Sequence, residues 1–180
     1  MSLTANTPSS QAAPREGLLP DRLFLLLTVV WAGSLWTIGY LVAPTLFASL
    51  PSRQMAGMVA GQLFRTEAIL GVVIGVLQLV LCNVMIRRGA THYRALRWLV
   101  LGMLCCVLIG YFGLQPFMES LRHKAQALGV GVGDSPFRAR FGLLHGISSA
   151  FYLLQSLLAL ALVWRVAAHG GRGDKGRRQM

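Results

Sequence analysis

The chain has 180 residues, of which 54% are hydrophobic and only 13% charged, and its formal net charge is +11. Soluble domains usually carry about 25% charged residues, so this composition argues against a water-soluble domain and indicates a membrane protein. We interpret the excess positive charge as basic segments that flank membrane helices and meet anionic lipid, in preference to nucleic-acid binding.

Residues 1–20 are polar and contain Pro14 and Pro20, so we predict a flexible tail there. The first apolar segment follows, and Asp21 before it is of a residue type that favours helix N-caps. We therefore expect the first helix to begin near Asp21, and Pro44 is expected to bend or end it. This segment is longer than the roughly 7 to 15 apolar residues of a signal peptide, which indicates a retained membrane helix.

Four apolar segments contain no Lys, Arg, Asp or Glu, and each has roughly the 20 residues that a helix needs to cross ~30 Å of hydrocarbon. They are residues 23–46, 68–86, 98–118 and 141–164. The sequence therefore predicts an all-α fold, an integral membrane four-helix bundle over residues 21–168, followed by a basic tail over residues 169–180.

Two connecting stretches have their own patterns. Residues 53–65 place apolar side chains at helical spacing, which predicts either a short interfacial helix or a lead-in to the second span. Residues 120–138 mix charges with GVGVGDSP, so the second half of this stretch is expected to be an irregular loop.

The basic residues predict the orientation, because basic flanks resist translocation. With four spans, both tails and the loop between the second and third spans share one side. That side holds 11 of the 17 basic residues, namely Arg15, Arg22, Arg87, Arg88, Arg94, Arg97, Arg165, Arg172, Lys175, Arg177 and Arg178. The other side holds Arg53, Arg65, Arg122, Lys124, Arg138 and Arg140. We expect a multi-pass membrane protein with both termini cytoplasmic.

Small residues recur on the last three spans, where they let two helix backbones approach closely. The glycines that we predict at helix contacts are Gly71, Gly75, Gly102, Gly110, Gly142 and Gly146. Polar residues follow neighbouring faces of the same spans, and we expect them to face the interior, where they find partners that lipid does not supply. This predicted polar face consists of Gln78, Gln115, Ser148, Tyr152 and Gln155.

Glu67, Glu119 and His145 fall at similar depth near the non-cytoplasmic ends of their spans. Ionisable residues in spans are candidate functional groups because their burial is costly, and carboxylates with an imidazole could ligate a divalent metal. The alternative is a structural polar cap, in which each carboxylate pairs with one of the arginines at the same depth. Both interpretations stay open at this stage.

The motifs of most enzymes are missing from the sequence, which has no phosphate-binding loop, GxSxG, HExxH or paired-cysteine knuckle. Ser148 or Ser149 beside His145 is the nearest approach to a hydrolase pair, but residues three or four apart on a helix touch by geometry alone. We therefore predict no enzymatic activity, no catalytic residues and no cofactor.

Three stretches in the same order, WAGSLWTIGYLVAPTLFASL, MAGMVAGQLFRTEA and RFGLLHGISSAFYLLQ, carry a family resemblance. Its residues are Gly33, Gly39, Ala43, Pro44, Leu46, Phe47, Ala56, Gly57, Gly61, Leu63, Phe64, Phe141, Leu144, His145, Gly146 and Ser148. Over residues 23–160 the chain resembles the bacterial four-span domain-of-unknown-function family that is related to eukaryotic transmembrane protein 205.

The resemblance implies an inner-membrane four-helix bundle without established catalysis. The eukaryotic relative is associated with resistance to platinum drugs, so the resemblance also suggests handling of metals or small solutes. Our first hypothesis is a non-enzymatic protein for transport or resistance, with Glu67, Glu119 and His145 as its polar site. The alternative is an accessory or assembly subunit whose small-residue helix faces bind another membrane protein or a second copy of the chain. Besides these proteins, the expected partner is the lipid bilayer.

Overall fold

The structure is a computed structural model that describes residues 18–177. The described residues form helices joined by short turns, without a strand. Four helices are long and apolar enough to cross a membrane, over Leu19–Ser49, Arg53–Arg87, Tyr93–Ala127 and Arg138–Ala168. The predicted all-α class with four spans is therefore confirmed.

The helical elements follow in the order α1 (Leu18–Trp36), η2 (Thr37–Val42), α2 (Ala43–Ser49), α3 (Arg53–Arg87), α4 (Tyr93–Val107), η3 (Leu108–Gly113), α5 (Gln115–Ala127), η4 (Val132–Asp134) and α6 (Arg138–Arg177). The segments η2 and η3 are π-helical and η4 is a 3-10 turn. Thus α1, η2 and α2 together build the first span, and α4, η3 and α5 build the third.

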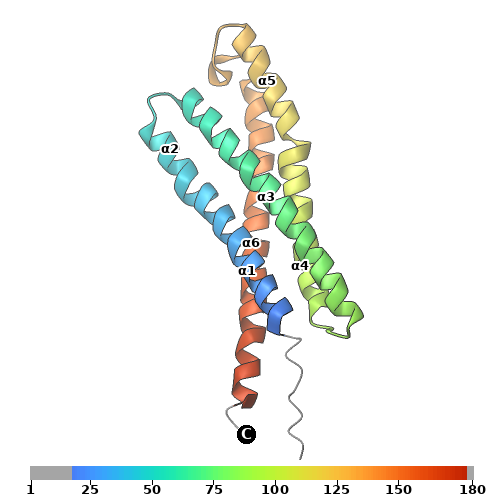
Figure 1. The fold of residues 1–180 in the computed structure, drawn as a ribbon. Helices are drawn as coiled ribbons and strands as arrows, with labels where there is room; N and C mark the ends of the chain where they lie inside the picture. The colour runs from blue at the N-terminus through green and yellow to red at the C-terminus, as the bar shows by residue number, and fades with distance from the viewer. Residues whose placement is uncertain (1–17, 178–180) are drawn as a thin grey trace, which may run out of the picture.

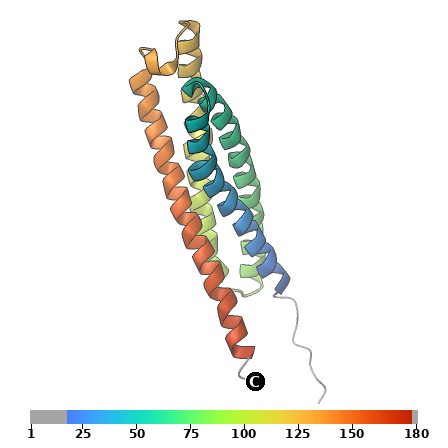
Figure 2. The same cartoon turned by 90° about the vertical axis from the view of Figure 1, so that its left-hand side faces the viewer.

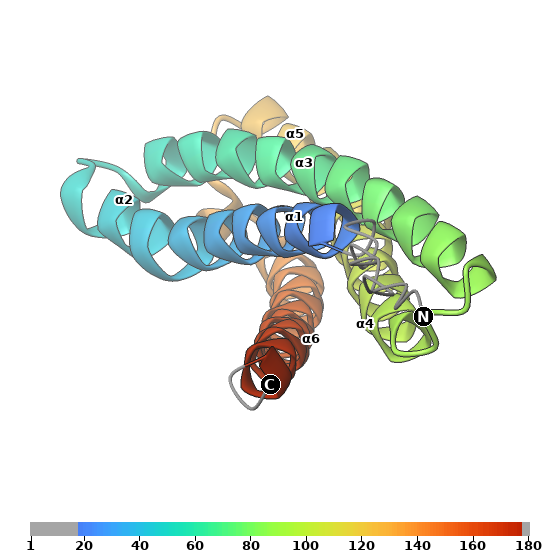
Figure 3. The ribbon, with the colours of Figure 1, turned by 60° about the horizontal axis from the view of Figure 1, so that its bottom comes forward.

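The spans run alternately up and down the bundle. The start of α1, the turn between α3 and α4, and the last part of α6 lie at one end, which is the lower end in Figure 1. Each helix contacts two neighbours in the ring α1–α3–α4–α6. Figure 2 shows α6 running along the whole length of the bundle, and Figure 3 shows α1 and α3 side by side with α4 and α6 beneath them.

The apolar core lies in the half of the bundle that contains the start of α1 and the α3–α4 turn. Its buried members are Phe24, Trp31, Ala32, Leu35, Ala68, Ile74, Cys82, Met85, Tyr93, Leu96, Val100, Met103, Leu104, Val107, Ala159 and Leu162. Most other large apolar side chains point outward, as expected where lipid is the solvent.

Four of the predicted packing glycines lie at helix contacts. A Cβ added to Gly71 would come within 2.6 Å of the Trp31 indole nitrogen, and one added to Gly75 would meet Leu104 and Trp31. Gly102 lies against Leu158, and Gly110 lies against Phe151. The Trp31 ring, which is 0% exposed, fits between α1 and α3 because these positions carry no side chain.

Gly142 and Gly146 do not lie at a helix contact within the described residues, contrary to the prediction. Both are exposed, and a Cβ added to either would meet nothing within 4 Å. The reason is the rotation of α6, which turns its Ser148 and Phe151 side toward η3 and so leaves the glycine side facing outward.

Two polar contacts, one buried and one part-buried, join helices in the core half. Gln78 Nε2 donates to Thr28 Oγ1 at 2.8 Å, which ties α3 to α1. The Tyr93 hydroxyl donates to Asp21 Oδ1 at 2.6 Å, which ties the start of α4 to the start of α1. Asp21 is therefore not the cap of the first helix: α1 begins at Leu18, and Asp21 lies in its first turn as an acceptor for α4.

Other boundaries agree with the predictions in part. Residues 53–65 are the lead-in to the second span, since α3 is one continuous helix whose N-cap Ser52 accepts a hydrogen bond from the Met55 backbone. Pro44 does not end the first helix, which continues through it as α2. At the other terminus α6 runs to Arg177, into the residues that the sequence predicts as a basic tail.

The contact between Gly71 and Trp31 can be tested by replacing Gly71 with alanine. We expect Gly71→Ala to lower the free energy of unfolding by about 1–3 kcal/mol, because the added methyl group overpacks a rigid, fully buried ring. Denaturation with sodium dodecyl sulfate in mixed micelles measures this quantity. Gly61→Ala in the same helix is the control, since its Cβ would meet nothing within 4 Å. Equal effects of the two substitutions would contradict the packing role.

Candidate functional site

The first and third spans each contain a π-helical segment shortly before a proline. Segment η2 precedes Pro44, and η3 precedes Pro116. Both segments contain the tripeptide Ile-Gly-Tyr, at residues 38–40 and 109–111. A proline removes one N–H from the helical hydrogen-bond ladder, and a π turn shifts the register, so that the Ala43 N–H donates to the Ile38 carbonyl.

The hydroxyl of Tyr152 on α6 enters the first of these segments. It donates a hydrogen bond of 2.5 Å to the Leu35 carbonyl on α1. Gly39 is required at this position, because an added Cβ would lie 2.7 Å from the Tyr152 hydroxyl and still closer to its ring. A side chain of α6 thus hydrogen-bonds the backbone just before η2, and insertion of a side chain into the ladder is a recognised cause of irregularity in helices.

The same region of α6 also binds the second segment. Ser148 Oγ donates to the Gly110 carbonyl in η3 at 2.9 Å, and Phe151 packs on the open side of Gly110. Neighbouring residues of one helix therefore satisfy backbone carbonyls in two other helices, which matters because a bilayer offers no water to do so.

Glu67 lies next to this junction on α3. Its side chain is 3% exposed, and its Oε1 has no hydrogen-bond partner among the described residues. Phe64, one turn earlier on α3, packs edge-to-face on the Tyr152 ring at 5.3 Å. A buried carboxyl with an unpaired oxygen costs free energy, so Glu67 needs an explanation other than packing.

Further buried polar atoms near the bundle axis also lack partners within the described part of the chain. They are Trp31 Nε1, Gln155 Nε2 and Gln78 Oε1. Gln155, at 2% exposure, is one helical turn from Tyr152 on α6. The interior therefore carries both unpaired acceptors, at Glu67 and Gln78, and unpaired N–H donors, at Trp31 and Gln155.

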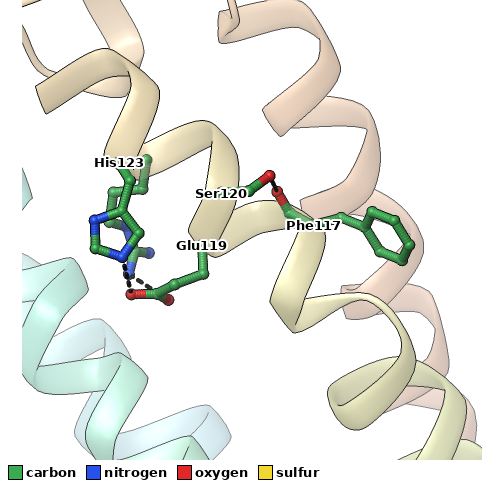
Figure 4. Close-up of polar contacts among 5 residues, drawn as sticks. Phe117, Glu119, Ser120 and His123 are labelled. Carbon is green, nitrogen blue, oxygen red and sulfur yellow. Dashed lines mark hydrogen bonds and ion pairs between the residues drawn. The ribbon is translucent and has the colours of Figure 1, made fainter. Parts of the chain in front are cut away.

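The three residues predicted as a polar or metal site are not brought together. Glu119 on α5 pairs with Arg122 at 3.5 Å and with His123 at 3.8 Å (Figure 4). His145 is exposed and stacks on Phe141, with ring centroids 6.2 Å apart. No group of three or more His, Cys, Asp or Glu side chains that could hold a metal occurs in the residues described. Glu119 thus pairs with an arginine, as the polar-cap interpretation predicts, whereas Glu67 pairs with no arginine in the described chain.

The predicted polar face is largely interior. Gln78 and Gln155 are buried, and Ser148, Tyr152 and Gln115 are half-buried. Sequence reasoning missed the acceptors of Ser148 and Tyr152, which are backbone carbonyls. The repeated Ile-Gly-Tyr before a proline is the signal that could have located these carbonyls in advance.

The Tyr152 hydrogen bond can be tested with Tyr152→Phe. We expect this substitution to lower the free energy of unfolding in detergent by about 1 kcal/mol, because it leaves the Leu35 carbonyl without its donor while retaining the ring. Tyr40→Phe is the matched control, since Tyr40 contacts the Tyr152 ring but is exposed. A loss of similar size in the control would count against the hydroxyl as the cause.

Two adjacent serines on α6 give a second comparison. Ser148→Ala is expected to cost about 0.6–1 kcal/mol, because Gly110 loses an interhelical donor. Ser149→Ala should have little effect, since Ser149 Oγ donates to the His145 carbonyl of its own helix. The same unfolding titration measures both variants, and a larger effect at Ser149 would refute the assignment.

A comparison with protein-family models finds one match, to the family described as Domain of unknown function (DUF4149), over residues 26–127. The matched residues include η2, Glu67 and η3 and end at the last residue of α5, so α6 lies outside them. Searches of curated proteins and of solved structures find no match. Since the matched residues make up more than half of its length, the chain belongs to the DUF4149 family.

Proposed function

We propose that the protein is a non-enzymatic protein of the cell inner membrane that takes part in the transport of metals or small solutes, or in resistance to them. The observation that carries this proposal is the buried carboxyl of Glu67, whose Oε1 has no partner among the described residues. In a chain with four candidate membrane spans, a carboxyl in this position is costly and is a functional candidate by default.

The groups around Glu67 favour a particular class of ligand. A carboxylate attracts cations and accepts hydrogen bonds, and the unpaired N–H groups of Trp31 and Gln155 lie in the same bundle interior. The carboxylate would bind the positive charge of a small cationic solute or of a metal ion, and the two N–H groups would donate hydrogen bonds to acceptor atoms carried by that solute or by the ligands of the metal. Gly39 in the π-helical segment η2 lies against Tyr152, and Phe64, one turn before Glu67, packs on the same ring. Such π turns occur frequently at functional sites.

The proposal also draws on the resemblance to the bacterial four-span family related to eukaryotic transmembrane protein 205, because the association of that eukaryotic relative with platinum resistance suggests solute handling. Within this chain, the resemblance includes Gly39 and Phe64, which lie against Tyr152. The solute site therefore coincides with residues on which the resemblance rests.

Part of the proposal is an orientation with both termini cytoplasmic. The start of α1, the α3–α4 turn and the last part of α6 share one end (Figure 1), and the sequence assigns 11 of the 17 basic residues to that side. Basic flanks are retained on the cytoplasmic side. A reporter that is active only in the cytoplasm should therefore work when fused after Met180, and activity only of a periplasmic reporter would reverse the orientation.

Glu67→Gln tests the solute site. The substitution keeps the shape of the side chain and removes its charge, so we expect the affinity for the ligand to fall about tenfold or more. Purified protein in nanodiscs is titrated with Zn²⁺ and, separately, with guanidinium, and binding is measured by calorimetry. Circular dichroism verifies that the helical content is unchanged.

The control for this experiment is Glu119→Gln, which removes a carboxylate that already pairs with Arg122 and His123. Its effect on binding should be less than twofold. If neither probe binds the wild-type protein, or if both variants weaken binding equally, Glu67 is not the solute site.

A second candidate function is that of an accessory or assembly subunit, or of a self-associating protein, and it rests on a different observation. Gly142, Gly146 and Ala150 form an exposed ridge on α6, and Cβ atoms added to the two glycines would meet nothing within 4 Å. Small residues on an outer face let a second membrane helix approach closely.

Gly146→Leu tests that candidate by filling the ridge, with Ile147→Leu as a control at the exposed neighbour. A pull-down in mild detergent should recover a membrane partner or a differently tagged second copy with the wild type and with Ile147→Leu, and lose it with Gly146→Leu. Recovery of the bait alone with the wild type would exclude both kinds of partner.

A further inference from the structure

A groove of about 290 Å³ lies between α5 and α6 at the end of the bundle opposite the start of α1. Its lining comes from one face of each helix and consists of Phe117, Ser120, Leu121, Arg140, Leu143 and Leu144. Residues at spacings of three and four lie on the same side of a helix. The three lining residues of α5 and the three of α6 therefore each form one strip along the groove.

The two polar residues of the lining lie in the part of the groove near the loop. Helix α5 runs toward the loop that joins it to α6, and α6 runs back from that loop (Figure 1). Ser120 and Arg140 therefore lie nearer the loop, and Phe117 and Leu143 lie roughly one helical turn deeper in the bundle. Phe117 and Leu143 are 63% and 66% exposed, so the deep part of the groove is open to hydrocarbon.

The charge of the groove is positive. No carboxylate is among its lining residues, and Figure 4 shows Glu119 on the other side of α5 from Phe117, in contact with His123. Arg140 forms no hydrogen bond or ion pair with another residue of the described chain. Its guanidinium is therefore available to an anion at the polar end of the groove.

We propose that the α5–α6 groove binds one anionic phospholipid. The headgroup phosphate pairs with Arg140 at the end near the loop, and an acyl chain lies along Phe117, Leu143 and Leu144. A zwitterionic lipid fits the apolar part equally well but offers Arg140 no net charge. The groove is separate from the Glu67 site, so this proposal does not depend on the proposed function.

The test is lipid titration of the purified full chain followed by native mass spectrometry. Phosphatidylglycerol and phosphatidylcholine with identical acyl chains are compared on the wild type and on Arg140→Gln. We expect the wild type to retain phosphatidylglycerol preferentially, and Arg140→Gln to weaken its binding about fivefold, since one basic residue near the membrane surface contributes about that factor. Binding of phosphatidylcholine should not change.

Two further variants separate a specific site from general charge. Arg138→Gln removes an exposed cation two residues away that does not line the groove, and it should leave binding unchanged, whereas Arg140→Lys should retain most of it. Equal affinity of the wild type for the two lipids, or equal losses in Arg138→Gln and Arg140→Gln, would overturn the proposal. Because Arg140 is exposed, we expect its substitution to leave the fold intact. Circular dichroism of each variant verifies this.

Discussion

The fold depends on the requirement that backbone hydrogen bonds be satisfied inside a bilayer without water. The first and third spans interrupt their own ladders at η2 and η3, before Pro44 and Pro116. In water such an interruption is repaired by solvent. Here α6 donates a hydrogen bond to the backbone near each interruption, from the Tyr152 hydroxyl to the Leu35 carbonyl and from the Ser148 hydroxyl to the Gly110 carbonyl. This helix therefore makes polar contacts with both irregular spans.

The same junction divides the bundle into two parts. On α1 and α4 the buried core ends at Leu35 and Val107, directly before η2 and η3, and on α3 it begins at Ala68. On one side of this level, Trp31 and the α3 glycines pack closely. On the other side, α2 and the first half of α6 expose most of their apolar side chains, whereas α5 buries Met118, Leu121 and Ala125. Glu67 lies at the boundary between the two parts.

The four spans, their all-α class and the interior position of Gln78 and Gln155 could be predicted from the sequence, because hydropathy and helical periodicity are local properties. The contacts of Gly71 and Gly110 could also be predicted, since small residues on spans favour close approach. The exposure of Gly146 could not, because it depends on how α6 is rotated against η3, which is set by Ser148 and Phe151. Glu67 and Glu119 looked equivalent in the sequence, but they differ because an arginine lies one turn beyond Glu119 on its own helix.

The first and third spans share a local pattern, because each contains the tripeptide Ile-Gly-Tyr shortly before a proline. In each case the glycine lies against an aromatic residue of α6, Tyr152 for Gly39 and Phe151 for Gly110. Consecutive residues of a helix point about 100° apart. Phe151 therefore contacts the third span and Tyr152 contacts the first span, although both residues lie at the same level of α6. The family match over residues 26–127 contains both interrupted spans and Glu67 but not α6. The hydrogen bonds to Leu35 and Gly110 nevertheless require α6, so the unit that satisfies its own backbone in this chain is the whole four-helix bundle.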